Sequence, residues 1–361
     1  MMYNSRKFCD SHVKLDFNNV LIVPKPSKIQ SRSLVKLEKT FRFNKKTDYT
    51  LPTKWSGVPI ISSNMDTVTG LDTFNVLRQH NYISCFPKHL NKEWIVKSVL
   101  PEELAYIDNY MLCCGINKYD TGILVSLIDR LQKEGISIKF ICIDIANGYL
   151  NKLLDVCSMF RERYPHLIIA AGNVVTPEGV QSIIKSGANL VKVGIGSGSC
   201  CTTRLKAGVG YPQLSAVLEC SEAARSVGGL IISDGGIVHP ADIVKAFAGG
   251  AGFVMLGSML AGHTESPGEL QLNSKDNMWY KTFYGMASSD AVSKYNAGMK
   301  NYRTAEGKTV QMRYKGDLIH TINDINGSLR SACTYVNATD LKELYVNSQF
   351  VLVNNTHNTS L

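Results

Sequence analysis

The chain has 361 residues, of which 44 % are hydrophobic and 19 % are charged, and its formal net charge at pH 7 is +9. These values are typical of a globular protein with a full core, and they exclude a disordered or fibrous protein. The longest basic run is the short "NKK" near residue 45, so the positive charge favours small anionic ligands, or only a basic surface, over nucleic acid.

The cysteines and the apolar segments indicate a cytoplasmic protein. Ten cysteines are scattered along the chain, and none has the paired spacing, with matching cysteines or histidines, of a zinc site. The N-terminal segment lacks the apolar core of a signal peptide, and no apolar run approaches the roughly 18 residues of a membrane span. We therefore expect free thiols in a reducing cytosol and no membrane association.

Short stretches rich in valine and isoleucine, each ending in a polar residue or glycine, are predicted to be strands. In chain order these eight stretches cover residues 57–66, 82–89, 109–115, 139–148, 167–173, 189–196, 229–236 and 252–258. The third of them has the least regular pattern. Between later strands, segments with helical spacing cover residues 148–165, 176–188, 212–228 and 239–251.

Continuous apolar strands that alternate with amphipathic helices predict a parallel sheet covered by helices on its faces. Eight such units predict a single (β/α)8 barrel, a TIM barrel, over residues 1–361. A doubly wound sheet is the alternative fold. Against it, the stretch "GIGSGS" lies far from the N-terminus and lacks an acidic residue about 20 positions later.

A long polar segment follows the eighth strand. Residues 259–316 are rich in glycine, serine and lysine and contain several aromatic side chains. Barrel enzymes place active-site lids in loops of this kind, so we expect an extended, mobile lid. The alternative is a disordered surface excursion, against which the aromatic residues argue.

Because the carboxyl ends of barrel strands face the active site, the residues after each strand are candidates for its lining. They include Asn64, Met65, Asp66, Lys88, His89, Asp144, Asn147, Asn173, Asp234, Gly235, Gly236, Gly257 and Ser258. The loops after strands seven and eight are glycine-rich, so their backbone N–H groups can approach a phosphate. These two loops predict a phosphate site, although such glycines also make tight turns without any ligand.

The loop "GSGSCCTTRLKAGVGYP", residues 196–212, offers a nucleophile. Cys201 precedes Arg204 by three positions, and a nearby cation with several backbone N–H groups favours the reactive thiolate. The hydroxyls of Thr202 and Thr203 are placed to shuttle a proton. An inert buried thiol is the alternative, and the residues alone leave both interpretations open.

At this loop the sequence resembles the signature that IMP dehydrogenases and GMP reductases share, a pattern close to GxGSxCTTRxxxGVGxPQ. The likeness continues through "KLDFNNVLIVPKPSKIQSRS", "NMDTV", "FICIDIANGY", "AGNVVT", "LIISDGGI" and "GFVMLGSMLAGH". The dehydrogenases usually carry a regulatory domain pair of about 120 residues after the second strand, for which this chain has no room. The later segments "YRTAEGKTV", "KGD" and "RSACTYVNA" are similar to the GMP reductase branch of the family.

The resemblance implies NADPH-dependent reduction of GMP to IMP with release of ammonia. Cys201 would attack C2 of the guanine ring and form a covalent thioimidate, while Thr203 and Glu306 would protonate the leaving amine. An IMP dehydrogenase without regulatory domains and a catalytically silent nucleotide-binding protein are the competing hypotheses. The resemblance also implies a homotetramer.

The resemblance further assigns binding residues. The GMP phosphate would be held by Ser199, Asp234, Gly235, Gly236, Gly257 and Ser258. The base would be read by Met286, Ser288, Arg303 and Gly307. Contacts to NADPH would come from Lys88, Asp144, Ile145, Ala146, Ile195 and Gly196, and, on a cofactor of a neighbouring subunit, from Ser31, Arg32, Ser331, Ala332, Cys333 and Thr334. A potassium ion would lie at Gly196, Gly198 and Cys201.

Some residues depart from the family pattern. Ser197 replaces a proline, which we expect to loosen the loop and weaken cation binding. Ser258 stands where many reductases have glycine, Ala287 replaces a common serine, Met312 replaces a common proline, and Cys113 and Cys114 replace small residues. None of these positions is Cys201, Thr203 or Glu306, so we expect effects on affinity rather than on the type of reaction.

Overall fold

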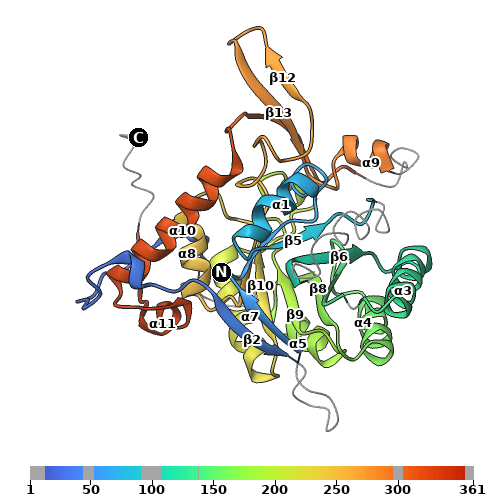
Figure 1. Cartoon of the computed structure of the whole chain (residues 1–361), viewed down its shortest axis with the longest axis horizontal. Helices are drawn as coiled ribbons and strands as arrows, with labels where there is room; N and C mark the ends of the chain where they lie inside the picture. The colour runs from blue at the N-terminus through green and yellow to red at the C-terminus, as the bar shows by residue number, and fades with distance from the viewer. Residues whose placement is uncertain (1–12, 44–52, 91–107, 137, 296–303, 354–361) are drawn as a thin grey trace, which may run out of the picture.

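A closed barrel of eight parallel strands forms the centre of the computed structural model, which describes residues 13–43, 53–90, 108–136, 138–295 and 304–353 (Figure 1). The barrel strands are β4 (Ile60–Ser62), β5 (Ile83–Phe86), β6 (Tyr110–Cys114), β7 (Phe140–Asp144), β8 (Ile168–Val174), β9 (Leu190–Val193), β10 (Leu230–Asp234) and β11 (Phe253–Leu256). The ring closes where Val254 of β11 pairs with Ile60 of β4. All eight predicted strands are confirmed, including the irregular third one, and the doubly wound alternative is wrong.

Helices cover the outside of the barrel. They include α1 (Leu71–Gln79), α3 (Lys118–Lys133), α4 (Asn151–Arg163), α5 (Pro177–Lys185), α7 (Gln213–Ser226), α8 (Pro240–Ala248) and α10 (Leu318–Tyr335). Local signals fix their starts: Thr176 caps α5 by accepting from the N–H of Gly179, and a proline occupies the first turn. The helix expected after the second strand lies outside the described residues. None of the helices in the described ranges is both long and apolar enough to cross a bilayer.

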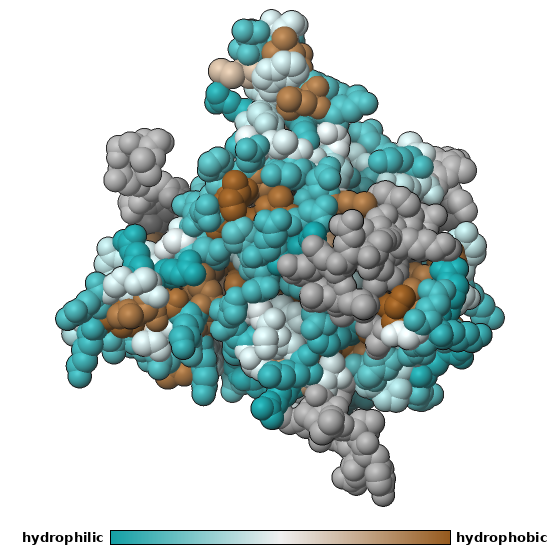
Figure 2. Space-filling view, viewed as in Figure 1, coloured by the Kyte–Doolittle hydropathy of each residue, from teal (hydrophilic) through white to brown (hydrophobic). Residues whose placement is uncertain are grey.

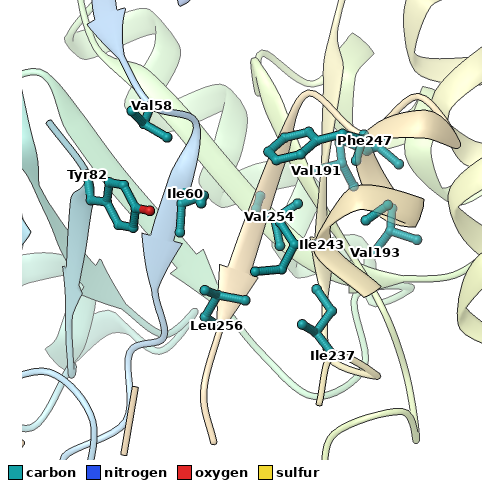
Figure 3. Close-up of a cluster of buried hydrophobic side chains, with 14 of the residues drawn as sticks. Val58, Ile60, Tyr82, Val191, Val193, Ile237, Ile243, Phe247, Val254 and Leu256 are labelled. Atoms are coloured by element: carbon teal, nitrogen blue, oxygen red, sulfur yellow. The ribbon is translucent and has the colours of Figure 1, made fainter. Parts of the chain in front are cut away.

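Outward-facing side chains of the strands pack against these helices. Figure 3 shows Val191 of β9 and Val254 of β11 beside Ile243 and Phe247 of α8, and all four are buried. Inward-facing residues alternate with them along each strand, as Leu190 does with Val191. The barrel therefore has two apolar layers, one between strands and helices and one inside the ring.

An aromatic plug closes the amino-terminal end of the barrel. The strands β2 (Lys39–Phe43) and β3 (Thr53–Gly57) pair as an antiparallel two-stranded sheet that carries Phe41 and Trp55. The ring of Phe41 lies 4.6 Å from that of Phe253, and Trp55 meets Phe140 edge-on at 6.1 Å. Phe253 and Phe140 are the first residues of β11 and β7. Ligands must therefore enter from the opposite, carboxyl end.

The segment expected to be an extended lid contains regular structure. Within the described part of residues 259–316, β12 (Leu270–Asn273), β13 (Met278–Tyr284) and β14 (Thr309–Arg313) form an antiparallel sheet, and α9 (Ser289–Tyr295) lies between β13 and β14. We call this segment the insertion. Its β12–β13 hairpin projects from the barrel in Figure 1, and exposed apolar side chains appear at its tip in Figure 2. Mobility of the insertion stays a prediction.

The two ends of the described chain meet on the outer layer. The strand β1 (Val20–Ile22), which follows the short helix η2 (Phe17–Asn19), pairs antiparallel with β15 (Phe350–Leu352), and α11 (Leu341–Asn347) precedes β15. The short helix η3 (Arg32–Leu34) packs against α10. Residues 87–109 lie between β5 and β6, and the absence of an inserted regulatory domain pair stays a prediction.

Candidate active site

The candidate nucleophile Cys201 lies in the loop between β9 and the short helix α6 (Thr203–Lys206). Its backbone N–H donates to the carbonyl of Gly198 at 2.9 Å, which folds the loop back on itself. The side chain of Cys201 is partly exposed, whereas Cys200 is only 4 % exposed. Burial raises the pKa of the Cys200 thiol to about 11, so at neutral pH Cys200 stays protonated. Of the two adjacent cysteines, Cys201 is the one placed to react.

Hydrogen bonds connect Cys201 to an acidic group through one hydroxyl. The thiol of Cys201 donates to Oγ1 of Thr203 at 3.1 Å, and the Thr203 hydroxyl donates to Oε2 of Glu306 at 2.7 Å. The insertion is held here by its backbone, because the N–H of Thr202 donates to the carbonyl of Glu306 at 2.8 Å. A proton can therefore pass between sulfur and carboxylate through Thr203.

The loops after β9 and β10 are in direct contact. Gly235 has φ +91°, and a Cβ at this position would lie 2.7 Å from Oγ of Ser197 and 3.0 Å from the N of Gly198. The N–H of Gly236 donates to the carbonyl of Ser197 at 2.9 Å, so this donor is used inside the protein. Close backbone approach thus explains the glycines. A phosphate ligand stays a prediction for these loops.

Ser197 constrains its loop through a hydrogen bond, although it lacks the ring of a proline. Its hydroxyl donates to the carbonyl of Asp234 at 3.3 Å, a bond that a proline could not make. The departures at 113 and 312 are also accommodated: Cys113 faces the barrel interior and accepts from Nδ2 of Asn64 at 3.4 Å, and Met312 packs against Gly262. Ala287 is exposed.

A network of charged side chains crosses the barrel at the carboxyl end of its strands, which we call the mouth. The ammonium of Lys192, which is 2 % exposed, pairs with Asp144 and lies 3.4 Å from Oδ2 of Asp234. Amide groups complete the network: Asn64 donates to Asp144 at 3.0 Å, and Asn173 donates to Asp234 at 2.8 Å. Burial alone would lower the pKa of Lys192, but the two carboxylates raise it well above its ordinary value, so Lys192 is charged.

Lys192 was not among the residues that sequence reasoning singled out. Its signal is a lysine inside the apolar stretch "NLVKVG", two residues after the inward-facing Leu190. Because side chains alternate along a strand, this register places Lys192 inside the barrel, where a charge needs a partner. Lys315 is a second residue that the sequence did not single out. It donates to the carbonyl of Ser258 at 2.7 Å, and burial lowers the pKa of Lys315 to about 8.

The predicted base-binding residues lie beside the nucleophile loop. Ser288 is buried, and its backbone pairs with Gly307 next to Glu306. A Cβ at Gly285 would lie 3.1 Å from the carbonyl of Cys200, so the chain preceding Met286 touches this loop. Arg303 lies outside the described residues. The structure thus brings the described members of this predicted set together around Cys201.

The predicted cofactor residues fall into two groups. Lys88, Asp144, Ile145, Ala146, Ile195 and Gly196 follow β5, β7 and β9 or end them, and so they lie at the same barrel end as Cys201. Ser31 and Arg32, with residues 331–334, belong to the region where η3 packs against α10. Cys333 is fully buried there, so its side chain cannot touch a ligand.

The potassium site predicted at Gly196, Gly198 and Cys201 rests on carbonyl oxygens. Gly196 has φ +79°, and the Gly198 carbonyl accepts from Cys201 while keeping a second lone pair for a cation. In the part of the chain that the structure describes, no group of three His, Cys, Asp or Glu side chains is arranged to hold a metal ion. The potassium site stays a prediction.

The fold and this site define a class: a (β/α)8 barrel in which a partly exposed cysteine is hydrogen-bonded through a threonine to a glutamate. Residues 14–359 match the family model described as the IMP dehydrogenase / GMP reductase domain, so the chain belongs to this family. It is 45 % identical to human GMP reductase 1, over 97 % of this chain and 98 % of that one. It is also 46 % identical to GMP reductase of Shewanella pealeana, over 97 % of both chains, and 46 % identical to human GMP reductase 2, over 95 % of both.

Proposed function

We propose that this protein reduces GMP to IMP and ammonia with NADPH as reductant. The observation that carries the proposal is the hydrogen-bonded line Cys201–Thr203–Glu306 at the open end of the barrel. The near-complete alignment with proteins named GMP reductase, from bacteria and mammals, supports the same activity. An intact relay argues against a catalytically silent nucleotide-binding protein.

The relay supplies the nucleophile and the proton-transferring group that the release of ammonia needs. The sulfur of Cys201 bonds to C2 of guanine, and its proton passes through Thr203 to Glu306. The bond between C2 and the 2-amino nitrogen then breaks, and the proton returns through Thr203 to the leaving amine, because an unprotonated amine leaves poorly. Ammonia departs, and the purine stays bound to Cys201 as a thioimidate.

The residues at the mouth fit a nicotinamide cofactor. When bound, NADPH supplies the hydride that replaces sulfur at C2. Asp144 offers a carboxylate held in place by Lys192. Burial raises the pKa of Asp144, but Lys192, with smaller contributions from Asn64 and Lys88, lowers it below its ordinary value. Lys88 also borders a cavity of about 800 Å³ whose lining includes Lys118, Arg130 and Asp120, and the excess of cations favours a ligand with phosphate groups. Ile145, Ala146, Ile195 and Gly196 would complete the contacts.

The remaining predicted ligand contacts form part of the same proposal. Ser199, Asp234–Gly236 and Gly257–Ser258 would hold the GMP phosphate, and Met286, Ser288, Arg303 and Gly307 would hold the base. Carbonyls of the Cys201 loop would ligate potassium, and a homotetramer would let Ser31, Arg32, Ser331, Ala332 and Thr334, but not the buried Cys333, reach a neighbour's cofactor. Support for a cytoplasmic location comes from the cysteines in the described ranges, which are all free thiols.

A two-direction assay tests the activity. With GMP and NADPH in potassium buffer, we expect loss of NADPH absorbance and formation of equal amounts of IMP and ammonia. With IMP and NAD⁺, we expect no reduction of NAD⁺. The opposite pattern would identify an IMP dehydrogenase without regulatory domains, and binding of GMP without turnover in either direction would identify a silent protein.

A further inference from the structure

We propose that Asp66 is a positioning residue: with Tyr284, Lys294 and Tyr295 it forms a latch that holds residues 285–288 of the insertion ready to bind GMP. The inference deepens the proposed function and rests on it for the identity of the nucleotide. Asp66 follows β4 in the barrel, whereas its partners belong to β13 and α9 of the insertion. The latch is therefore a contact between two parts of the chain more than 200 residues apart.

The contacts of the latch converge on one oxygen. Oδ2 of Asp66 accepts from the Tyr284 hydroxyl at 2.6 Å, from Nζ of Lys294 at 2.8 Å and from the Tyr295 hydroxyl. Lys294 also donates to the Tyr284 hydroxyl at 3.2 Å and lies 5.1 Å from the Tyr295 ring centre, within cation–π range. Charge-assisted bonds of this kind are stronger than neutral ones.

The hydrogen bonds to Asp66 stabilise the docked insertion because the carboxylate is buried. Asp66 is 8 % exposed, and its other oxygen, Oδ1, has no hydrogen-bond partner among the described residues. Burial raises the pKa of Asp66, but the hydrogen bonds from Lys294, Tyr284 and Tyr295 outweigh it and lower the pKa below its ordinary value. Asp66 is therefore a charged group whose compensation comes from the insertion. If the insertion moved away, a buried carboxylate would lose its partners, so docking of the insertion is favoured.

The position of the donors decides what the latch holds. Tyr284 comes directly before the segment 285–288, and Lys294 and Tyr295 end the helix that follows it. The segment is thus attached to the barrel at both of its ends. Its Ser288 pairs with Gly307, which adjoins the relay residue Glu306. The anchor is firm on the barrel side, because the loop before Asp66 is tied to β11 by the bond from the N–H of Ser63 to the carbonyl of Leu256 at 2.9 Å.

A ring stack extends the latch toward the cofactor side. The Tyr295 ring lies parallel to that of His89, with 4.1 Å between centres and 8° between planes. His89 follows Lys88, which we assign to the cofactor. Tyr295 therefore contacts both Asp66 and the loop that carries Lys88 and His89.

Breaking the latch should change the kinetic constants differently from removing a catalytic group: it should affect KM for GMP more than kcat. If residues 285–288 are ordered before GMP binds, breaking the latch leaves fewer molecules competent to bind, and the apparent affinity falls in proportion. Once GMP is bound, the segment is in place and chemistry proceeds. We therefore expect Asp66→Asn, which keeps the shape but removes the charge, to raise KM for GMP about tenfold or more while kcat changes less than about threefold.

The experiment compares D66N with D276N. Asp276 accepts from Tyr280 at 2.6 Å on the exposed hairpin, so this control removes a similar carboxylate–tyrosine bond without joining the insertion to the barrel. We would measure kcat and KM for GMP, and amide hydrogen exchange of residues 284–295 without nucleotide. D66N should raise KM and speed exchange of these amides, and D276N should do neither. A fall in kcat at unchanged KM, or unchanged exchange in D66N, would overturn the proposal.

A second pair of variants covers the case in which D66N does not fold. The Lys294 side chain is 55 % exposed, so Lys294→Met removes the cation with little risk to the core, and Lys275→Met on the hairpin is its control. K294M should repeat the KM and exchange effects, and a K294M enzyme identical to the wild type would refute the latch. If the wild type did not turn over GMP, the proposed function would fail, whereas the exchange measurement would still decide whether the latch exists.

Discussion

The hydroxyl of Thr203 donates to the carboxylate of Glu306 across 2.7 Å, although 103 residues separate them. Thr203 belongs to the loop after β9, and Glu306 belongs to the insertion beyond β11. The same hydroxyl accepts from Cys201, so one side chain connects the proposed nucleophile to the proposed acid. Docking of the insertion is therefore a condition for the relay that we propose, because Glu306 belongs to the insertion.

Replacing the nucleophile tests the covalent step. Cys201→Ala should abolish turnover and leave GMP binding measurable, because the ligand contacts remain while the bond to C2 cannot form. Cys200→Ala is the matched control and should keep most activity, since Cys200 is buried and its thiol is protonated. Initial rates and calorimetric titration with GMP report the two properties. Measurable turnover by C201A would remove the covalent mechanism.

Replacing the acid tests the relay. Glu306→Gln keeps the size of the side chain but cannot carry the proton, so kcat should fall by about a hundredfold or more. KM for GMP should change little, and Glu269→Gln, at an exposed position on the insertion, should leave both constants unchanged. Steady-state kinetics measures kcat and KM of each variant. A nearly normal kcat for E306Q would show that another group protonates the amine.

Removing the buried cation tests the network below the mouth. Lys192→Met leaves the carboxylates of Asp144 and Asp234 without their ammonium, and loss of one partner of a buried pair costs about 3 kcal/mol of unfolding free energy or more. The double variant K192M/D144N should lose less than K192M, because it also removes one unpaired charge. Urea denaturation measures both, with the exposed Lys185→Met as control. Equal stability of K192M and wild type would contradict the charge pairing.

A buried histidine predicts a stability change with pH. Burial, helped by Lys315, lowers the pKa of His263 from 6.5 to about 4, and its Nε2 lies 2.7 Å from Oγ1 of Thr321. Between these values the unfolded chain takes up a proton that the folded chain does not, so this contribution is complete above 6.5 and is lost as the pH falls toward 4. Urea midpoints from pH 7 to 4.5 should fall more for the wild type than for His263→Gln. Parallel curves would show that His263 titrates normally in the folded protein.

Much of the architecture could be predicted from sequence because its signals are local. Eight buried strands are continuous apolar runs, and helix starts such as Thr176 with Pro177 are marked by capping residues. The insertion carries weaker local signals. Its polar composition suggested an extended lid, but its strands pair with one another and leave their outer residues in water, so "LQLN" at 270–273 is strand although every residue in it is exposed.

By itself, the sequence determined the barrel, the loop that carries Cys201 and the polar residues at the strand ends, since each is encoded within a few neighbouring residues. Only the tertiary structure decided which of these groups meet: Lys192 with Asp144 and Asp234, and Asp66 with Lys294. Contacts such as these depend on how strands 40 or more residues apart are registered and on where the insertion docks. No local pattern records them, because their energies arise only when distant charges are buried together.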